Sequence, residues 1–170
     1  MSSMEAKLDD RPRSETAPPA AARKDTIMTQ LYDEDVEVGA ELPSLTKEQS
    51  LKAIVMYAWG SNDLADGHYD YKKAVDRGLP DVFGQGAQTA GYMGQMLSDW
   101  YTPGGFLRKL TAQYRQTTEP GDVLTTRGEV TRKYREDGQN FIDCNIWVEN
   151  QNGQRVSVGQ AIVSLPSRDG

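Results

Sequence analysis

Asp63 and His68 are the two side chains whose types and spacing best suit acid–base chemistry. Both lie in the polar segment Ser61–Asp70, and His68 is the only histidine among the 170 residues. A carboxylate and an imidazole that converge on one water molecule can take up and return its proton, which is worth roughly 10²–10⁴-fold in rate. On residue type alone, a surface histidine beside a helix-terminating aspartate is still the favoured interpretation.

The segment before this pair is predicted to be a helix from Lys47 to about Trp59. Thr46 and Gln49 have the spacing of a capping box, which marks the start of a helix. Apolar residues then recur at helical spacing: Leu51, Ile54, Val55 and Ala58. The pair would therefore follow the end of a helix, where a loop can present polar groups to a cleft. A short helical turn is predicted beyond the pair, around Tyr71–Arg77.

A second, longer helix is predicted over Gly86–Trp100. Small residues recur along it at three- and four-residue spacing: Ala87, Ala90, Gly91 and Gly94. Each glycine costs about 1 kcal/mol against alanine in an isolated helix, so another element should pack close to this backbone. Large residues cover much of the remaining circumference: Tyr92, Met93, Met96, Leu97 and Trp100. We therefore expect this helix to be buried nearly all round.

Strands are predicted on both sides of the two helices. An early strand over Glu34–Leu45 is interrupted by Gly39 and Pro43. Four later strands are expected around Phe106–Tyr114, Val123–Val130, Ile142–Val148 and Val156–Leu165. Asp137-Gly138 and Asn152-Gly153 predict tight hairpins between the last three. The pattern predicts an α+β fold in which an antiparallel β-sheet wraps around a long central helix.

Length and composition predict one folded domain, residues 31–170, preceded by a disordered tail, residues 1–30. The tail has no aromatic residue and contains the Ala/Pro run Ala17–Ala22. It therefore offers too little apolar surface to offset the entropy of ordering. It also lacks the continuous apolar stretch of a secretory signal.

The charge and the cysteine content narrow the range of partners and ligands. The net charge is −6 and there is no basic block, so we expect no nucleic-acid partner. No apolar run approaches the length that spans a bilayer, so no membrane partner is expected either. One histidine and the single Cys144 cannot supply a standard zinc site, so no metal is expected. These features favour a cytoplasmic location.

An ordered series of residues extends beyond the Asp63/His68 pair. It continues with Asp70, Ala74, Gly78-Leu79-Pro80 and Gln85-Gly86, the last of which opens the long helix. Further matching segments are Tyr32–Gly39, Leu97–Trp100, Tyr114-Arg115 and Pro120–Asp122. Over about residues 32–165 the series resembles the MaoC-like (R-specific) enoyl-CoA hydratase/dehydratase family. That family has Asp-x-Asn-Pro-x-His-x-Asp, then an alanine and a glycine, then His-Gly at the start of its central helix.

The resemblance implies the hotdog fold and the reversible syn hydration of a 2-enoyl thioester to a 3-hydroxyacyl thioester. Asp63 and His68 would be the catalytic pair that activates the water, with either one as the base. The backbone N–H of Gly86 would bind the thioester oxygen at the helix N-terminus, where developing negative charge is favoured. A packing or turn glycine is the alternative for Gly86. Gln85 is assigned to substrate binding, and Asp66 and Asp70 to supporting positions around the pair.

Two departures from the family pattern bear on this assignment. Ala65-Asp66 replaces the family's Asn-Pro, and the lost proline loosens the loop that carries His68. Gln85 replaces the histidine before the helix glycine. Neither departure removes the catalytic pair, but both bear on rate and substrate.

The expected substrate is an acyl-CoA or an acyl chain on a carrier protein, with coenzyme A only as part of the substrate and no separate cofactor. Six basic residues are candidates for binding its phosphates, although most are expected to be ordinary solvated charges: Lys72, Lys73, Arg77, Arg108, Lys109 and Arg115. Four aromatic residues could line an acyl tunnel, although a core role is favoured: Trp59, Phe83, Tyr92 and Trp100.

Two other functions compete with the hydratase interpretation. A hotdog thioesterase usually carries its carboxylate on or beside the central helix, where this chain offers only Asp99 near the far end. The second is a non-catalytic or half-catalytic subunit of a heteromeric hydratase, which the departures at Ala65-Asp66 and Gln85 keep open. Because an exposed edge strand invites pairing, we expect a dimer. A homodimer is the first expectation, and a heteromer with another hotdog chain is the alternative.

Overall fold

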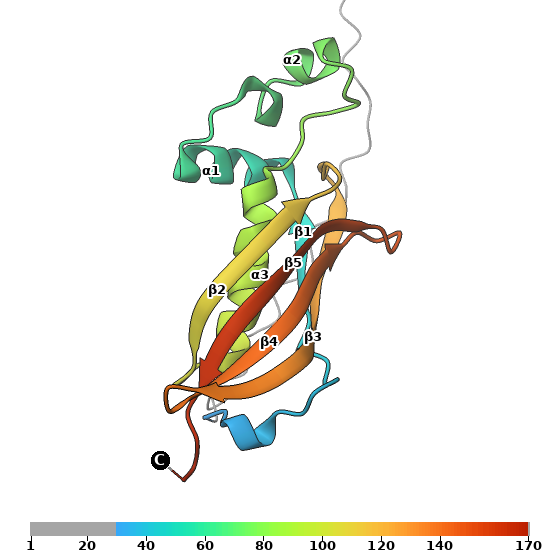
Figure 1. Ribbon diagram of the computed structural model, residues 1–170. Coiled ribbons are helices and arrows are strands. Elements are labelled where there is room, and N and C mark those ends of the chain that lie inside the picture. The colour runs from blue at the N-terminus through green and yellow to red at the C-terminus, as the bar shows by residue number, and fades with distance from the viewer. Residues whose placement is uncertain (1–29, 170) are drawn as a thin grey trace, which may run out of the picture.

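The computed structural model describes residues 30–169, in which one antiparallel sheet curls around one long helix (Figure 1). The strands are β1 (Leu45–Gln49), β2 (Phe106–Tyr114), β3 (Asp122–Glu136), β4 (Gln139–Glu149) and β5 (Arg155–Leu165). The α-helices are α1 (Leu51–Ser61), α2 (Tyr71–Asp76) and α3 (Gly86–Tyr101), and two 3-10 turns are η1 (Asp33–Asp35) and η2 (Asp66–His68). The predicted tail falls, except for Gln30, outside the described residues.

The sheet has the order β1-β3-β4-β5-β2, and all neighbouring strands are antiparallel. Both predicted hairpins are confirmed. Between β3 and β4, Asp137 and Gly138 have φ of 49° and 78°, the left-handed pair that a tight two-residue hairpin turn requires. Between β4 and β5, Gly153 has φ of 73°. The predicted α+β architecture, an antiparallel sheet around a long central helix, is therefore confirmed.

The core lies between α3 and the concave face of the sheet. Met93, Met96 and Leu97 of α3 are fully or almost fully buried. They belong to one cluster with inward-facing strand residues that include Leu124, Val130, Ile142, Ile146, Val148 and Val163. This packing fixes where the N-terminus of α3 lies relative to the end of β2.

The predicted start of the first helix is wrong. Residues Leu45–Gln49 form β1, which pairs with β3 from Leu45 opposite Thr126 to Gln49 opposite Asp122. The hydroxyl of Thr46 faces that of Thr125 at 3.2 Å and does not cap a helix. Instead, Ser50 caps α1 by accepting a hydrogen bond from the backbone N–H of Ala53 at 3.1 Å. A contact 79 residues away in the sequence overrode the local capping pattern.

Two further expectations need correction. The early strand over Glu34–Leu45 is mostly absent, because η1 begins it and only Glu41 forms an isolated bridge, with Glu129. The long helix is not buried all round, because Ala87, Gly91 and Asp99 are exposed. A side chain added at Gly91 would meet no described atom within 4 Å. In the single chain, α3 therefore packs the sheet with one face and leaves part of its small-residue stripe uncovered.

Candidate active site

The predicted site residues lie in the overhang, residues 51–85, and at the N-terminus of α3, which follows it. The overhang comprises α1, η2, α2 and their connecting loops, and it extends past the end of the sheet above α3 (Figure 1). α1 ends at Ser61 and is followed by its C-cap residue Asn62, whose φ of 59° is left-handed and turns the chain sharply. Asp63 follows directly, so the end of α1 determines where its carboxylate lies.

Asp63 and His68 are close together in the structure. Asp63 Oδ2 lies 3.6 Å from His68 Nε2, which is slightly beyond a direct hydrogen bond. The His68 residue is only 5% exposed, whereas the Asp63 side chain is 48% exposed. The pair therefore combines a nearly buried imidazole with a carboxylate open to solvent, and one water molecule beside the two groups could contact both.

The backbone of Phe83 fixes the protonation of the His68 ring. Nδ1 of His68 lies 2.7 Å from the carbonyl oxygen of Phe83. A carbonyl oxygen can only accept a hydrogen bond, so Nδ1 must carry the proton. In the neutral ring, Nε2 is then an unprotonated acceptor, and it is the nitrogen that faces Asp63. This arrangement suits a base.

Gly67 allows Phe83 to pack this closely. The ring of Phe83 lies against the imidazole, with centroids 4.4 Å apart and planes at 60°. The backbone N–H of Phe83 donates to the carbonyl of Gly67 at 3.2 Å. A Cβ atom at position 67 would lie 2.6 Å from Phe83 Cε1, so any side chain there must displace the ring.

Asp66 and Asp70 have partners of their own. Asp70 caps α2 by accepting a hydrogen bond from the backbone N–H of Lys73 at 3.1 Å. Asp66 accepts a hydrogen bond from the Tyr69 hydroxyl at 3.2 Å, which raises the pKa of Tyr69, and it lies 4.0 Å from Arg77. Their described contacts are thus within the overhang, and their supporting role at the pair stays a prediction.

Gly86 begins α3 and lies beneath an aromatic ring. Gln85 occupies the N-cap position but its side chain makes no capping hydrogen bond, and the first turn has no acidic residue. The first N–H groups of a helix have no acceptor within the helix and lie in its positive field. A Cβ atom at Gly86 would lie 2.5 Å from Cγ of Tyr114. Only glycine lets Tyr114 and the helix backbone come this close.

The side chain of Gln85 points into the protein. It is 2% exposed, and its Nε2 donates to the carbonyl of Ile54 at 3.4 Å. Its Oε1 has no hydrogen-bond partner among the described residues. Beside it, Gln49 Nε2 donates to Gln88 at 2.9 Å and to Thr118 at 3.3 Å. Neutral polar groups thus surround the start of α3.

A cleft of about 310 Å³ opens at this helix N-terminus. Phe83–Gly86 form one side of it and Tyr114–Thr118 the other, together with the buried hydroxyls of Thr89 and Ser157, which lie 2.7 Å apart. The cleft includes Gln85 and Gly86 but neither Asp63 nor His68, although His68 contacts Phe83, which lines the cleft. Thr89 and Ser157 could not be assigned to the site from the sequence, because neither belongs to a motif and only the fold brings them together.

Tyr57 of α1 lies near both Asp63 of the pair and Tyr114 of the cleft. Burial raises the pKa of Tyr57, and the nearby groups Tyr114 and Asp63 raise it further. A larger hollow of about 480 Å³ lies on the outer face of the sheet, around Trp147 and Arg155, and contains none of the predicted site residues. We therefore place the candidate site at the α3 end, where the paired side chains and the helix N-terminus coincide.

The aromatic tunnel candidates separate in the structure. Trp59 is 69% exposed, so the expected core role is wrong for it. Tyr92 and Trp100 pack against the main core, as the core interpretation predicted. Phe83 lines the cleft and also contacts His68.

Comparisons with known proteins agree with this fold. The chain is 30% identical over 132 residues to the beta subunit of the 3-oxo-4,17-pregnadiene-20-carboxyl-CoA hydratase of Mycobacterium tuberculosis, covering 78% of this chain and 97% of that subunit. The crystal structure of the ChsH1–ChsH2 complex from M. tuberculosis contains a chain that is 27% identical, with a TM-score of 0.67, covering 76% of this chain and 98% of that one. No family model matches the chain.

Other solved structures support the fold. The R-hydratase PhaJ1 from Pseudomonas aeruginosa is 20% identical with a TM-score of 0.72, covering 79% of this chain and 85% of that one. The (R)-hydratase from A. caviae is 23% identical with a TM-score of 0.71, and the match covers 78% of this chain and 99% of that one. The fold and these similarities thus define a hotdog protein of the hydratase/dehydratase class. The chain belongs to the MaoC-like hydratase/dehydratase family.

No helix in residues 30–169 has the length and apolar character needed to cross a bilayer.

Proposed function

We propose that this chain catalyses the reversible addition of water to the double bond of a 2-enoyl-CoA, with Asp63 and His68 as its catalytic pair. The observation that carries the proposal is the 3.6 Å approach of Asp63 Oδ2 to His68 Nε2 at the end of the fold where α3 begins. The identity with a hydratase subunit supports the reaction class.

His68 is the proposed base. Its Nε2 takes a proton from water while the water oxygen bonds to C3 of the substrate, and the electron pair of the double bond moves toward the thioester oxygen. The resulting imidazolium would face the Asp63 carboxylate, which stabilises it. The imidazolium then returns the proton to C2 on the same face. Water is thereby added in full and both side chains end as they began.

Gly86 is the proposed site for the charge that forms on the thioester oxygen. Its backbone N–H is at the uncapped start of a 16-residue helix, in the cleft beside Tyr114. Donors of this kind are fixed before the reaction, and removing one typically costs about 10²–10³-fold in kcat. A main-chain donor on glycine also lets the substrate approach closely.

The decisive experiment measures hydration directly. The purified chain is mixed with crotonyl-CoA, octenoyl-CoA and a steroid enoyl-CoA, and the loss of absorbance of the conjugated enoyl thioester is followed. The steroid is included because the similar M. tuberculosis subunit belongs to a hydratase named for a pregnadiene carboxyl-CoA. Asp63→Asn and His68→Gln should each slow any hydration by roughly 10²–10⁴-fold. Asp76→Asn, which removes an exposed carboxylate at the end of α2, should not.

A second candidate function is that of one subunit in a heteromeric hydratase. Two similar proteins favour it, because one is named a beta subunit and the other is part of a ChsH1–ChsH2 complex. β2 is a nine-residue edge strand whose outer side has no partner among the described strands, so a second hotdog chain could pair there. A folded chain that hydrates no thioester alone, and gains activity with a companion hotdog chain, would establish this function instead.

A further inference from the structure

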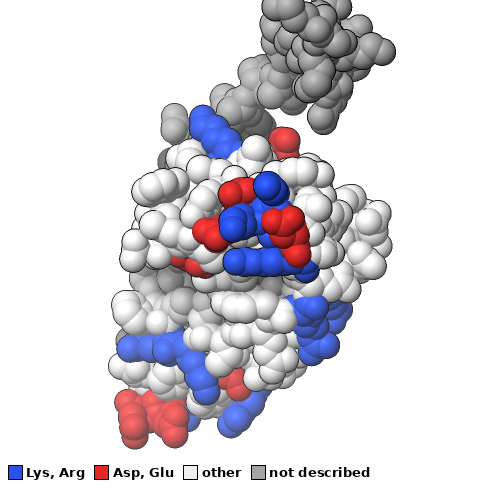
Figure 2. Space-filling model, turned by 90° about the horizontal axis from the view of Figure 1, so that it is seen from above, with Lys and Arg blue, Asp and Glu red and all other residues white. Residues whose placement is uncertain are grey.

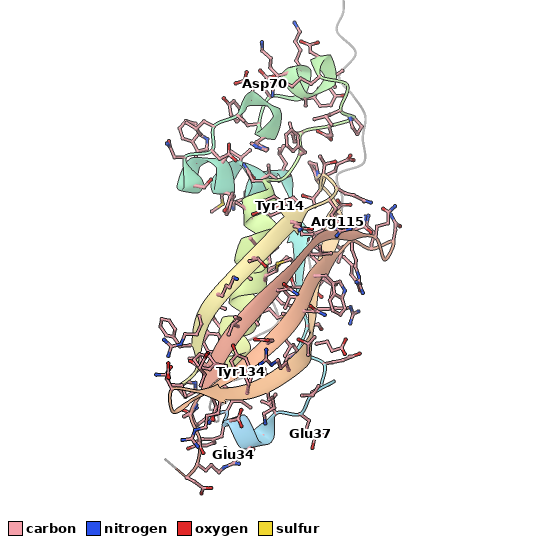
Figure 3. All side chains as sticks on the ribbon, in the orientation of Figure 1. Glu34, Glu37, Asp70, Tyr114, Arg115 and Tyr134 are labelled. Atoms are coloured by element: carbon pink, nitrogen blue, oxygen red, sulfur yellow. The ribbon has the colours of Figure 1, made fainter. Side chains whose placement is uncertain are left out.

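Arg115 lies at the mouth of the cleft, next to the ring that covers Gly86. β2 ends at Tyr114, and the backbone N–H of Arg115 donates to the carbonyl of Val156 at 2.8 Å, which holds this point of the chain against the start of β5. Figure 3 shows Tyr114 and Arg115 together at the end of β2 that is nearest the overhang. Arg115 therefore presents a positive charge beside the proposed thioester site.

The charge of Arg115 is not balanced by a nearby carboxylate. Within residues 30–169, its guanidinium forms no ion pair, whereas Arg127 pairs with Glu149 at 2.6 Å. Asp122, the first residue of β3, accepts hydrogen bonds from the Glu119 backbone and from Gln151, both at 2.9 Å. The donors of Arg115 thus stay available at the cleft.

The other five basic candidates lie elsewhere. Three are on or just after α2: Lys72, Lys73 and Arg77. Figure 2 looks down on the overhang end and shows acidic and basic groups intermixed there, and Arg77 itself lies 4.0 Å from Asp66. Arg108 and Lys109 are near the opposite end of β2, about 15–20 Å from Tyr114 at the usual rise of a strand. Of the six, Arg115 alone lines the cleft.

The carrier part of a thioester substrate would bring negative charge to the mouth of the cleft, where Arg115 lies. The reacting acyl group is neutral, but the pantetheine arm beyond the sulfur ends in phosphate, in coenzyme A and in carrier proteins alike. A guanidinium matches phosphate with paired, charge-assisted hydrogen bonds. Building on the proposed function, we propose that Arg115 binds a phosphate group of the thioester carrier and so helps to hold the substrate at the cleft.

Binding measurements test this without requiring activity. The full chain and its Arg115→Gln variant are titrated by calorimetry with coenzyme A, dephospho-coenzyme A, 4′-phosphopantetheine and pantetheine. We expect the variant to bind coenzyme A about tenfold more weakly, because a hydrogen bond to a charged group is lost, and to bind pantetheine unchanged. Arg127→Gln, an exposed arginine of β3 that is not part of the cleft, is the matched control and should bind all four ligands like the unmodified chain.

The ligand series distinguishes the sources of the phosphate. If Arg115→Gln also binds 4′-phosphopantetheine more weakly, Arg115 contacts the phosphate of the pantetheine arm itself, which a carrier protein shares. If the variant loses affinity only for coenzyme A, Arg115 contacts the 3′-phosphate. If it loses affinity for coenzyme A and dephospho-coenzyme A but not for 4′-phosphopantetheine, Arg115 contacts the diphosphate. All three support the proposal.

Three results would overturn the proposal: unchanged affinity for coenzyme A in Arg115→Gln, an equal loss for pantetheine, or no binding of coenzyme A by the unmodified chain. Failure of the proposed function looks different. In that case, no enoyl thioester is hydrated, while Arg115→Gln still weakens the binding of coenzyme A.

Discussion

The carbonyl oxygen of Phe83 accepts a hydrogen bond from His68 Nδ1 at 2.7 Å, which leaves Nε2 of the same ring facing Asp63. This one main-chain contact sets the tautomer of the only histidine in the chain. It also joins two parts of the overhang, η2 and the loop that leads into α3. The expected chemistry depends on this contact as much as on the pair itself.

His68→Gln and Asp63→Asn should each lower kcat by roughly 10²–10⁴-fold, because each removes one partner of a unit that acts on the same water. The double variant should be little slower than the worse single one, since residues that act as a unit are strongly non-additive. Steady-state hydration of the preferred enoyl-CoA measures all three. Losses that multiply in the double variant would mean that the two side chains act independently.

Gly67→Ala should lower kcat without touching either catalytic side chain. Its Cβ atom would lie 2.6 Å from Phe83 Cε1, so the ring and the carbonyl that holds His68 must shift. Kinetics and a denaturant titration on the same sample separate the effect on rate from the effect on stability. Gly60→Ala is the matched control, because its Cβ atom would meet nothing within 4 Å in the described residues. It should raise the free energy of unfolding by about 0.5–1 kcal/mol, as alanine does within a helix.

Gly86→Ala should destabilise the fold by about 1–3 kcal/mol, because overpacking displaces the Tyr114 ring from a Cβ position only 2.5 Å from its Cγ atom. Combining it with Tyr114→Ala removes the clashing ring, so the two losses in stability should be less than additive. Thermal unfolding of the four proteins gives the coupling energy. Simple additivity would contradict the close approach of ring and helix.

The stability of the protein should fall in alkaline solution partly because of Cys144. Burial raises the pKa of this thiol from 9.0 to about 12. The folded state therefore holds its proton more tightly than the unfolded state, so the contribution is full below about pH 9 and is lost as the pH rises from about 9 to 12. Urea titrations across this range should show a shallower decline for Cys144→Ala than for the unmodified chain. Equal slopes would show that the thiol does not titrate with unfolding.

Local patterns predicted those parts of the fold that local interactions specify. The small-residue helix at Gly86 and the turns at Asp137-Gly138 and Asn152-Gly153 are confirmed within a residue or two. β1 could not be predicted in the same way, because Thr46 and Gln49 carry a helix-capping pattern that only pairing with β3 overrides. Here a partner far away in the sequence decides the structure.

The same division applies to the candidate site. Asp63 and His68 were identified from an ordered series of residues, and the structure brings them together. Asp70 has the spacing of a helix cap, and it caps α2. The carbonyl of Phe83 could not be predicted, because a main-chain acceptor has no residue signature. Nor could the Tyr114 ring over Gly86, which depends on where β2 ends beside α3.

The side chain of Gln49, at the end of β1, bonds to Gln88 and to the Tyr92 hydroxyl of α3 and to Thr118 after β2, so it joins three segments around the helix start. All of these groups are neutral. Dissolved salt screens charges and leaves such a framework almost unchanged, whereas an attraction between a guanidinium and a phosphate weakens as ionic strength rises. Added salt should therefore raise KM and leave kcat unchanged. Steady-state kinetics over a single series of salt concentrations would then separate the contribution of the neutral hydrogen-bonded groups from that of the charged substrate contact.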